Sequence, residues 1–135
     1  MSFINEAILL IINVLHIIVI LFVLCAPFSG SNYFLTMHIM IVPFILLHWI
    51  LNNNTCSLTV AEKFIREKTY GKQVNEDECY SFKFIAPIYD FNKNHEAYSN
   101  FTYGLTISLW LISVYNIGTK IHNGEIKKFE DMCKL

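Results

Sequence analysis

The stretch from Ala7 to Leu51, "AILLIINVLHIIVILFVLCAPFSGSNYFLTMHIMIVPFILLHWIL", decides the fold class. It contains two long runs without Asp, Glu, Lys or Arg, at 7–28 and 33–51, joined by a few polar residues. Each run has about the length that a helix needs to cross roughly 30 Å of hydrocarbon. The stretch therefore predicts two antiparallel transmembrane helices near the start of the chain.

The polar residues between the two runs predict a tight turn. Pro27 and Gly30 break a helix there, and the neighbouring serines and asparagine favour turn positions. The first run has no basic start and no small-residue cleavage site, so we expect it to be retained rather than removed as a signal peptide. Pro43 lies inside the second run and removes one backbone hydrogen bond. Membrane helices tolerate such a proline when a neighbouring helix satisfies the freed carbonyl.

A third apolar run, "FTYGLTISLWLISVYNIG" at 101–118, predicts a third transmembrane helix. The 135 residues then form a single all-α membrane domain, with an extramembrane segment at about 52–100 and a polar tail at about 119–135. Apolar residues make up 54% of the chain and charged residues only 16%, below the roughly one in four of soluble domains. The net charge is −1 and the lysines are scattered, which argues against a nucleic-acid partner.

The second run leaves the membrane in "HWILNNNTCSLTVAEK", from His48 to Lys63. Trp49 suits the depth of the lipid headgroups, and the three asparagines favour caps and turns. Thr59 with Glu62 three residues later has the spacing of a capping box. We therefore expect an amphipathic surface helix from about Thr59 to Tyr70, with Phe64 on its apolar face. The predicted partner-docking segment consists of Asn52, Asn53, Asn54, Thr59 and Glu62.

The rest of the extramembrane segment is acidic and then aromatic. The sequence "CYSFKFIAPIYDF", from Cys79 to Phe91, alternates aromatic and polar residues at its start, which predicts a short extended segment in an aromatic-rich loop. Three crossings would place the N-terminus and 52–100 on one side of the membrane and the tail on the other. The higher density of lysine in the tail favours a cytoplasmic tail.

Two polar stripes follow the predicted membrane helices. Polar groups inside a membrane are costly, so each stripe needs a reason. Helix–helix hydrogen bonding is one reading of both stripes, and a wetted path or ligand pocket is the other. The first-helix stripe is Glu6, Asn13 and His16, and the third-helix stripe is Thr102, Thr106, Ser113 and Asn116.

The histidines and cysteines are candidate ligands for a cofactor or a metal, and the cysteines are candidates for a disulfide. His16, His38 and His48 lie at different predicted depths, so they are poorly matched as a pair of haem ligands. The four cysteines match no zinc pattern, and no catalytic triad motif is present. We therefore expect no cofactor, no metal and no enzymatic activity. Cys56 and Cys79 would form a disulfide in an oxidising compartment or remain thiols in a reducing one.

The pattern H-W-x-x-N-N-N-x-C-x-L-T-x-x-E, carried by His48 to Glu62, resembles one other group of proteins. It is similar to a segment of small multi-pass membrane proteins of large double-stranded DNA viruses that infect algae and protists. A C-P-L-T-x-x-E version in bacterial membrane proteins is also similar, although Ser57 here replaces its proline. The match covers about 20 residues of this chain. It implies a place in a virion or a host-derived internal membrane and carries no activity.

The sequence therefore favours a non-enzymatic, multi-pass integral membrane protein. Its role would be structural, in assembly, or in docking a protein partner such as a capsid protein or another membrane protein. One alternative is a small channel or transporter that uses the first-helix stripe. A second alternative is a cofactor-bearing subunit of a membrane enzyme that uses the histidines.

Overall fold

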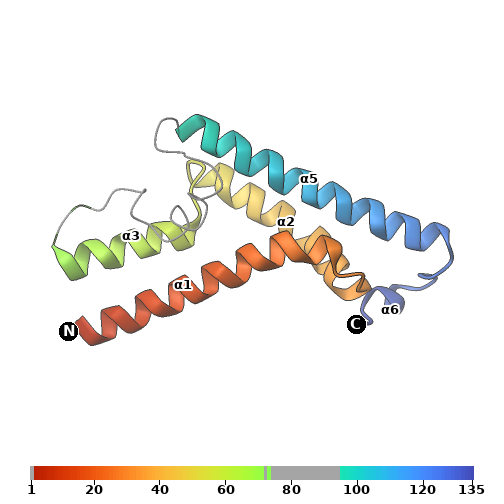
Figure 1. Ribbon diagram of the computed structural model, residues 1–135, viewed down its shortest axis with the longest axis horizontal. Helices are drawn as coiled ribbons and strands as arrows, with labels where there is room; N and C mark the ends of the chain where they lie inside the picture. Colours follow the sequence, from red (N-terminus) through yellow and green to blue (C-terminus); the bar gives the residue numbers. More distant parts are fainter. Residues whose placement is uncertain (1, 72, 74–94) are drawn as a thin grey trace. The chain divides into compact units, whose positions relative to one another are not determined.

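The computed structural model describes residues 2–71, 73 and 95–135, and all of its regular elements are helices (Figure 1). The helices are α1 (Ser2–Cys25), the short 3-10 helix η1 (Ala26–Phe28), α2 (Asn32–Leu51), α3 (Ser57–Tyr70), α5 (His95–His122) and α6 (Phe129–Met132). The predicted all-α class is confirmed for these residues. The predicted aromatic loop at 79–91 lies outside them.

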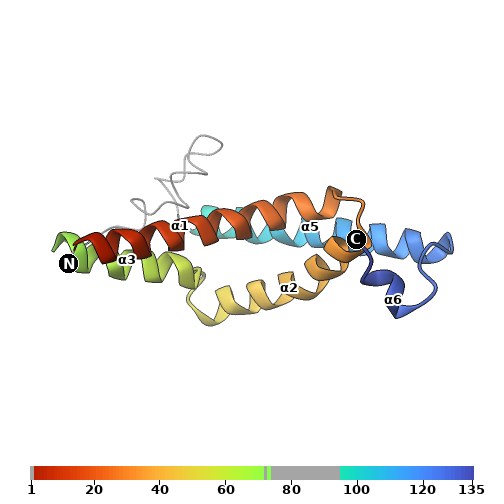
Figure 2. The same cartoon turned by 90° about the horizontal axis from the view of Figure 1, so that it is seen from below.

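The chain divides into two compact units, which are described separately. The first unit contains Met1–Val19 and His48–Ser99, and the second contains Ile20–Leu47 and Asn100–Leu135. Helix α1 contributes its N-terminal part to the first unit and its C-terminal part to the second. In the first unit, α3 runs alongside the start of α1 in the opposite direction, as both views show (Figures 1 and 2).

Two helices, not three, are long and apolar enough to cross a membrane in the described part of the chain. They cover Phe3–Phe28 and Asn32–Leu51. The prediction of a third such helix at 101–118 is wrong by this criterion. Helix α5 has the length, but the threonines, serines, asparagine and two tyrosines within 101–118 lower its mean hydropathy. Thr106 and Ser113 are buried among these polar residues, whereas Ser108 and Tyr115 are exposed.

The second unit is built around carbonyl groups that prolines leave without a donor. Pro27 has no N–H to donate to the carbonyl of Val23, four residues earlier, as a continuing α-helix would require. The Nε2 of His38, on α2, lies 3.1 Å from that carbonyl oxygen and donates to it. The other ring nitrogen, Nδ1, then accepts from the hydroxyl of Ser113 on α5 at 2.9 Å. His38 therefore links α1, α2 and α5.

Pro43 produces the same situation inside α2. It leaves the carbonyl of Ile39 without its helical donor, and the indole Nε1 of Trp110 donates to that oxygen at 3.1 Å. The side-chain amide of Asn116 donates to the carbonyl of Pro27 at 2.9 Å. His38 contacts Ser113, and the next residue, Ile39, contacts Trp110, which comes earlier in α5. Helices α2 and α5 are therefore antiparallel. These hydrogen bonds connect residues 27–39 to residues 110–116.

The C-terminal tail docks on the start of α2. Ile126 is buried with Leu35 and Ile117, and Met132 packs against the same cluster. The backbone N–H of Tyr33 donates to the carbonyl of Lys134 at 3.1 Å. The sequence predicted a polar tail, and the buried Ile126 is the signal that this prediction missed.

Trp110→Phe tests the proline-freed carbonyl of Ile39. It keeps an aromatic ring but removes the donor, so the free energy of unfolding in detergent should fall by about 1–3 kcal/mol, the cost of an unsatisfied buried carbonyl. Pro43→Ala restores a backbone N–H four residues after Ile39 and should remove most of that loss. A double-mutant cycle measures the coupling. Equal losses in the two backgrounds would show that the indole N–H does not serve this carbonyl.

Asp131→Asn tests the docking of the tail. The carboxylate of Asp131 accepts from the ammonium of Lys134 and from the backbone N–H groups of Lys127 and Lys128, which together lower its pKa to about 2. Because the folded pKa is depressed, this contribution is complete above the ordinary value of 3.8 and is lost as the pH falls towards about 2. The variant should speed hydrogen exchange across α6 at neutral pH. Exchange identical to that of the wild type would contradict this role.

Candidate functional site

The turn from α2 into α3 is organised by residues of the segment from His48 to Glu62. The Nε2 of His48 accepts from the backbone N–H of Ser57 at 3.0 Å, which satisfies a donor in the first turn of α3. The side-chain amide of Asn52 donates to the carbonyl of Thr55 at 3.0 Å. Asn53 and Asn54 adopt left-handed backbone conformations, with φ of 53° and 61°. Asparagine tolerates this region better than most residues, which explains the run of asparagines at this point.

Helix α3 begins earlier than predicted and buries a different face. Its first residue is Ser57 and Cys56 is its N-cap, so the predicted capping box with Thr59 at the N-cap is wrong. Thr59 and Glu62 are instead buried, whereas Phe64 is 62% exposed. The predicted apolar docking face is therefore the outer face, and the helix turns polar side chains inwards.

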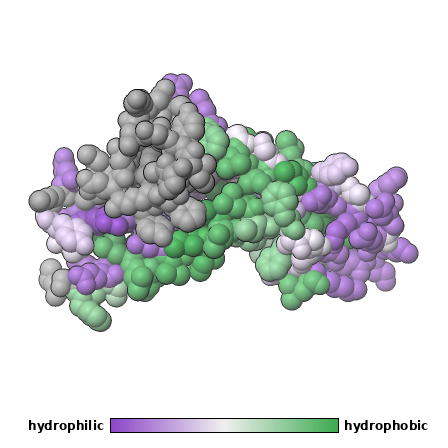
Figure 3. All heavy atoms as spheres, viewed as in Figure 1, coloured by the Kyte–Doolittle hydropathy of each residue, from purple (hydrophilic) through white to green (hydrophobic). Residues whose placement is uncertain are grey.

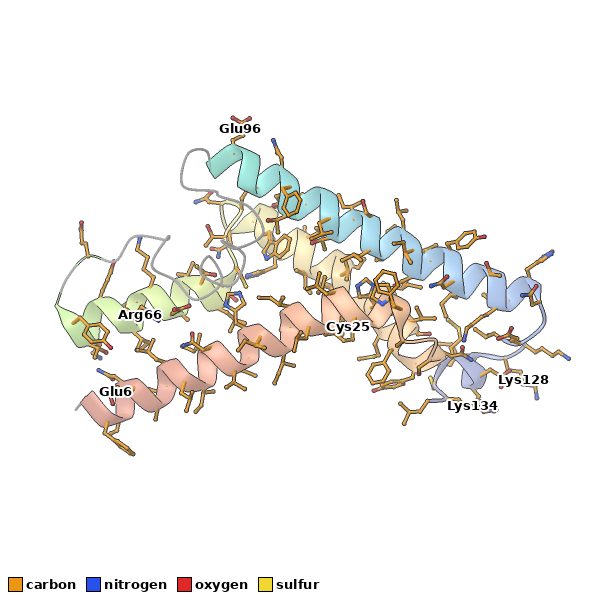
Figure 4. All side chains as sticks on the ribbon, viewed as in Figure 1. Glu6, Cys25, Arg66, Glu96, Lys128 and Lys134 are labelled. Atoms are coloured by element: carbon orange, nitrogen blue, oxygen red, sulfur yellow. The ribbon has the colours of Figure 1, made fainter. Side chains whose placement is uncertain are left out.

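Glu62 is the most unusual residue of the first unit because it is a fully buried carboxylate. Its Oε1 accepts from the Nε of Arg66, one turn later on α3, at 2.8 Å. Figure 4 shows the two labelled residues Arg66, on α3, and Glu6, near the start of α1. Charged side chains are almost never fully buried without a partner, so this ion pair is what allows Glu62 to lie inside.

The first-helix stripe is divided by the structure. Glu6 is exposed, His16 is only 5% exposed, and the carboxylate of Glu62 acts on the His16 ring electrostatically. Asn13 Oδ1 and His16 Nδ1 are buried without a hydrogen-bond partner among the described residues. The name "Glu62 site" is used below for Glu62, Arg66 and His16. This site brings together two predicted residues from separate segments, the first-helix stripe and the docking segment.

The third-helix stripe faces the interior of the second unit. Ser113 and Asn116 form the two hydrogen bonds described above, Thr106 is buried, and Thr102 is partly buried. Ser113 and His38 have the hydroxyl-to-imidazole geometry of a nucleophile and its base. Both side chains are 0% exposed, however, and the second ring nitrogen faces a backbone carbonyl. The pair therefore joins helices and has no access to a substrate.

The described residues contain no group of three or more His, Cys, Asp or Glu side chains placed to hold a metal ion. His38 uses both ring nitrogens, and His48 uses Nε2, in the hydrogen bonds given above. Cys25, Cys56 and Cys133 are free thiols. Cys79 lies outside the described residues, so the predicted Cys56–Cys79 disulfide stays a prediction.

Comparisons of the chain with protein-family models, with curated proteins and with solved structures found no match. The site is therefore interpreted from its own chemistry.

Glu62→Ala tests whether the Glu62 site holds α3 in place. It removes the acceptor of Arg66, so the free energy of local opening should fall by about 1.5–3 kcal/mol, the range for a hydrogen bond to a charged group. Hydrogen exchange across Ser57–Tyr70 measures the opening. Lys68→Ala is the matched control, because Lys68 is exposed on the same helix. Equal effects of the two alanines would show that the ion pair contributes nothing beyond helix propensity.

Proposed function

We propose that the chain is a multi-pass integral membrane protein with a non-enzymatic role in assembly or in docking a protein partner. The observation that carries the membrane part is the distribution of side chains. Within the described residues, polar side chains are buried beside a small apolar core, and many large apolar side chains are exposed. The buried polar side chains are His16, His38, Thr59, Glu62, Thr106 and Ser113.

The two apolar helices are mostly uncovered by protein. Only 22% of the apolar window of Phe3–Phe28 and 17% of that of Asn32–Leu51 is buried. A core helix of a soluble protein would be mostly buried, and large exposed apolar patches mark interaction or membrane surfaces. Figure 3 shows hydrophobic side chains covering much of the visible surface of these helices. Lipid is the solvent that fits this surface, since burying it in lipid removes the cost of its hydration.

Helix α5 is joined to α2 by hydrogen bonds. Its apolar residues Leu105, Leu111 and Ile112 are exposed, while Ser113 and Trp110 bond to α2. In hydrocarbon, backbone carbonyls need partners within the protein. The donors from α5 and α2 to the proline-freed carbonyls are therefore the arrangement that an apolar solvent requires.

The docking role rests on the α2–α3 turn. Hydrogen bonds from His48 and Asn52, together with the Glu62 site, give this turn and α3 a defined shape. The exposed apolar residues Val60 and Phe64 then form an outward surface on α3. We infer that this surface contacts a protein partner such as a capsid protein or another membrane protein. The resemblance of residues 48–62 to viral membrane proteins supports a virion or host-derived internal membrane as the location.

Extraction and cysteine labelling test the membrane assignment. The protein should stay in the membrane pellet at alkaline pH and should be released only by detergent. Single-cysteine variants that keep only Cys56 or only Cys133 should react with an impermeant maleimide from opposite sides of sealed vesicles. This follows because Cys56 lies beyond the end of α2 and Cys133 lies beside its start. Labelling of both from one side would contradict a crossing by α2.

A further inference from the structure

The second unit has an open pocket of about 440 Å³ where the α1–α2 turn meets the end of α5. One part of its lining is apolar and another part is polar. Lys120 and Asn123 are on the polar side, together with Glu125 at the beginning of the tail. Phe28, Leu35 and Tyr115 are on the apolar side. The pocket is therefore amphipathic.

Lys120 is the cation of this pocket, and its ammonium group is held by neutral acceptors. The Nζ donates to the carbonyl of Gly30 at 2.5 Å and to Oδ1 of Asn32 at 2.7 Å. Neither acceptor carries a charge, and within the described ranges Lys120 forms no ion pair. An ammonium has three donors, so one remains after these two bonds. The side chain is thus held in position with one donor to spare.

The pocket also has a defined place relative to the apolar helices. Phe28 ends the first candidate span, and Asn32 begins the second. Phe28 and Tyr115 are 68% and 74% exposed, so an apolar surface continues from the pocket along the helices. The tail beside it adds Lys128 and Lys134, labelled in Figure 4, while the Asp131 carboxylate already accepts from Lys134. If the helices lie in a bilayer, the pocket lies at the level of the headgroups.

We propose that this pocket binds the phosphate of an anionic phospholipid, with Lys120 as the charged donor and the acyl chains following Phe28 and Tyr115. The inference rests on the proposed membrane location and adds a ligand class to it. An amphipathic pocket favours a molecule with an anionic head and an apolar body over a free anion. The Glu125 carboxylate in the lining disfavours a second negative charge, which favours a singly charged phosphodiester.

The test uses the purified full chain in vesicles of equal parts phosphatidylglycerol and phosphatidylcholine, followed by native mass spectrometry of the detergent-released protein. The wild type should retain phosphatidylglycerol over phosphatidylcholine by at least about tenfold, which corresponds to about 1.4 kcal/mol. Lys120→Met should abolish the preference, and Lys120→Arg should keep it. Lys134→Gln is the matched control, because it removes the same charge from the tail outside the pocket lining.

Lys120→Met also removes hydrogen bonds to the α1–α2 turn, so a loss of lipid preference could come from a folding defect. A second variant separates the two causes. Asn123→Asp adds a carboxylate to the pocket lining without removing the bonds of Lys120, and it should lower the preference at least severalfold. Asn100→Asp makes the same change on an exposed residue at the other end of α5 and should have no effect. Competition by millimolar inorganic phosphate is measured in parallel and should be absent.

Each contrary result overturns the inference. If the wild type shows no preference although it stays with the vesicles, the lipid site is wrong and the membrane assignment stands. Equal losses with Lys120→Met and Lys134→Gln would mean unspecific charge attraction. Displacement of phosphatidylglycerol by inorganic phosphate would mean a site for the free anion. If the protein does not stay with the vesicles at all, the membrane assignment fails together with the lipid site.

Discussion

The second unit depends on one constraint, which is that a backbone carbonyl in apolar surroundings must find a donor. Two prolines break that rule within the helices, and two aromatic N–H groups from neighbouring helices restore it. His38 serves the carbonyl of Val23, and Trp110 serves that of Ile39. The side-chain amide of Asn116 also donates to a backbone carbonyl, that of Pro27 in η1. The packing of α1, α2 and α5 can therefore be understood as satisfaction of the carbonyls that the prolines released.

The first unit follows a related rule for charge. Glu62 is fully buried, and the cost of burying its charge is offset by the Arg66 guanidinium on the same helix. This explains why a polar face, rather than an apolar one, points inwards from α3. A buried ion pair specifies one arrangement because both partners must meet. Exposed apolar groups such as Phe64 are then left for a partner or for lipid.

The two proposals use different ends of the chain's apolar helices. Docking would use α3 and the turn that His48 and Asn52 shape, at the end of α2. Lipid recognition would use Lys120 and the α1–α2 turn, at the start of α2. Since α2 connects these regions, a crossing by α2 would place them on opposite faces of a membrane.

Much of the architecture could be predicted from the sequence, because hydrophobic runs and helix-breaking residues determine the helices of their own segments. The two runs at 7–28 and 33–51, the turn at Pro27 and Gly30, and the asparagine exit from α2 all follow from residue type and spacing. So did the need for a neighbour to satisfy the carbonyl freed by Pro43. The sequence overstated the apolar character of 101–118, since its count of uncharged residues ignored the hydroxyl and tyrosine groups that lower the mean hydropathy.

Tertiary structure alone decided which polar groups meet. Spacing marked Ser113 and Asn116 as a stripe, but only packing selected His38 and the carbonyl of Pro27 as their partners. The start of α3 was misplaced because Thr59 with Glu62 fits a capping box as well as a buried face. The helix instead begins at Ser57, whose N–H donates to the His48 ring. Local patterns determine where helices form, since their hydrogen bonds lie within one segment. Partners between helices depend on distances across the fold, which no single segment contains.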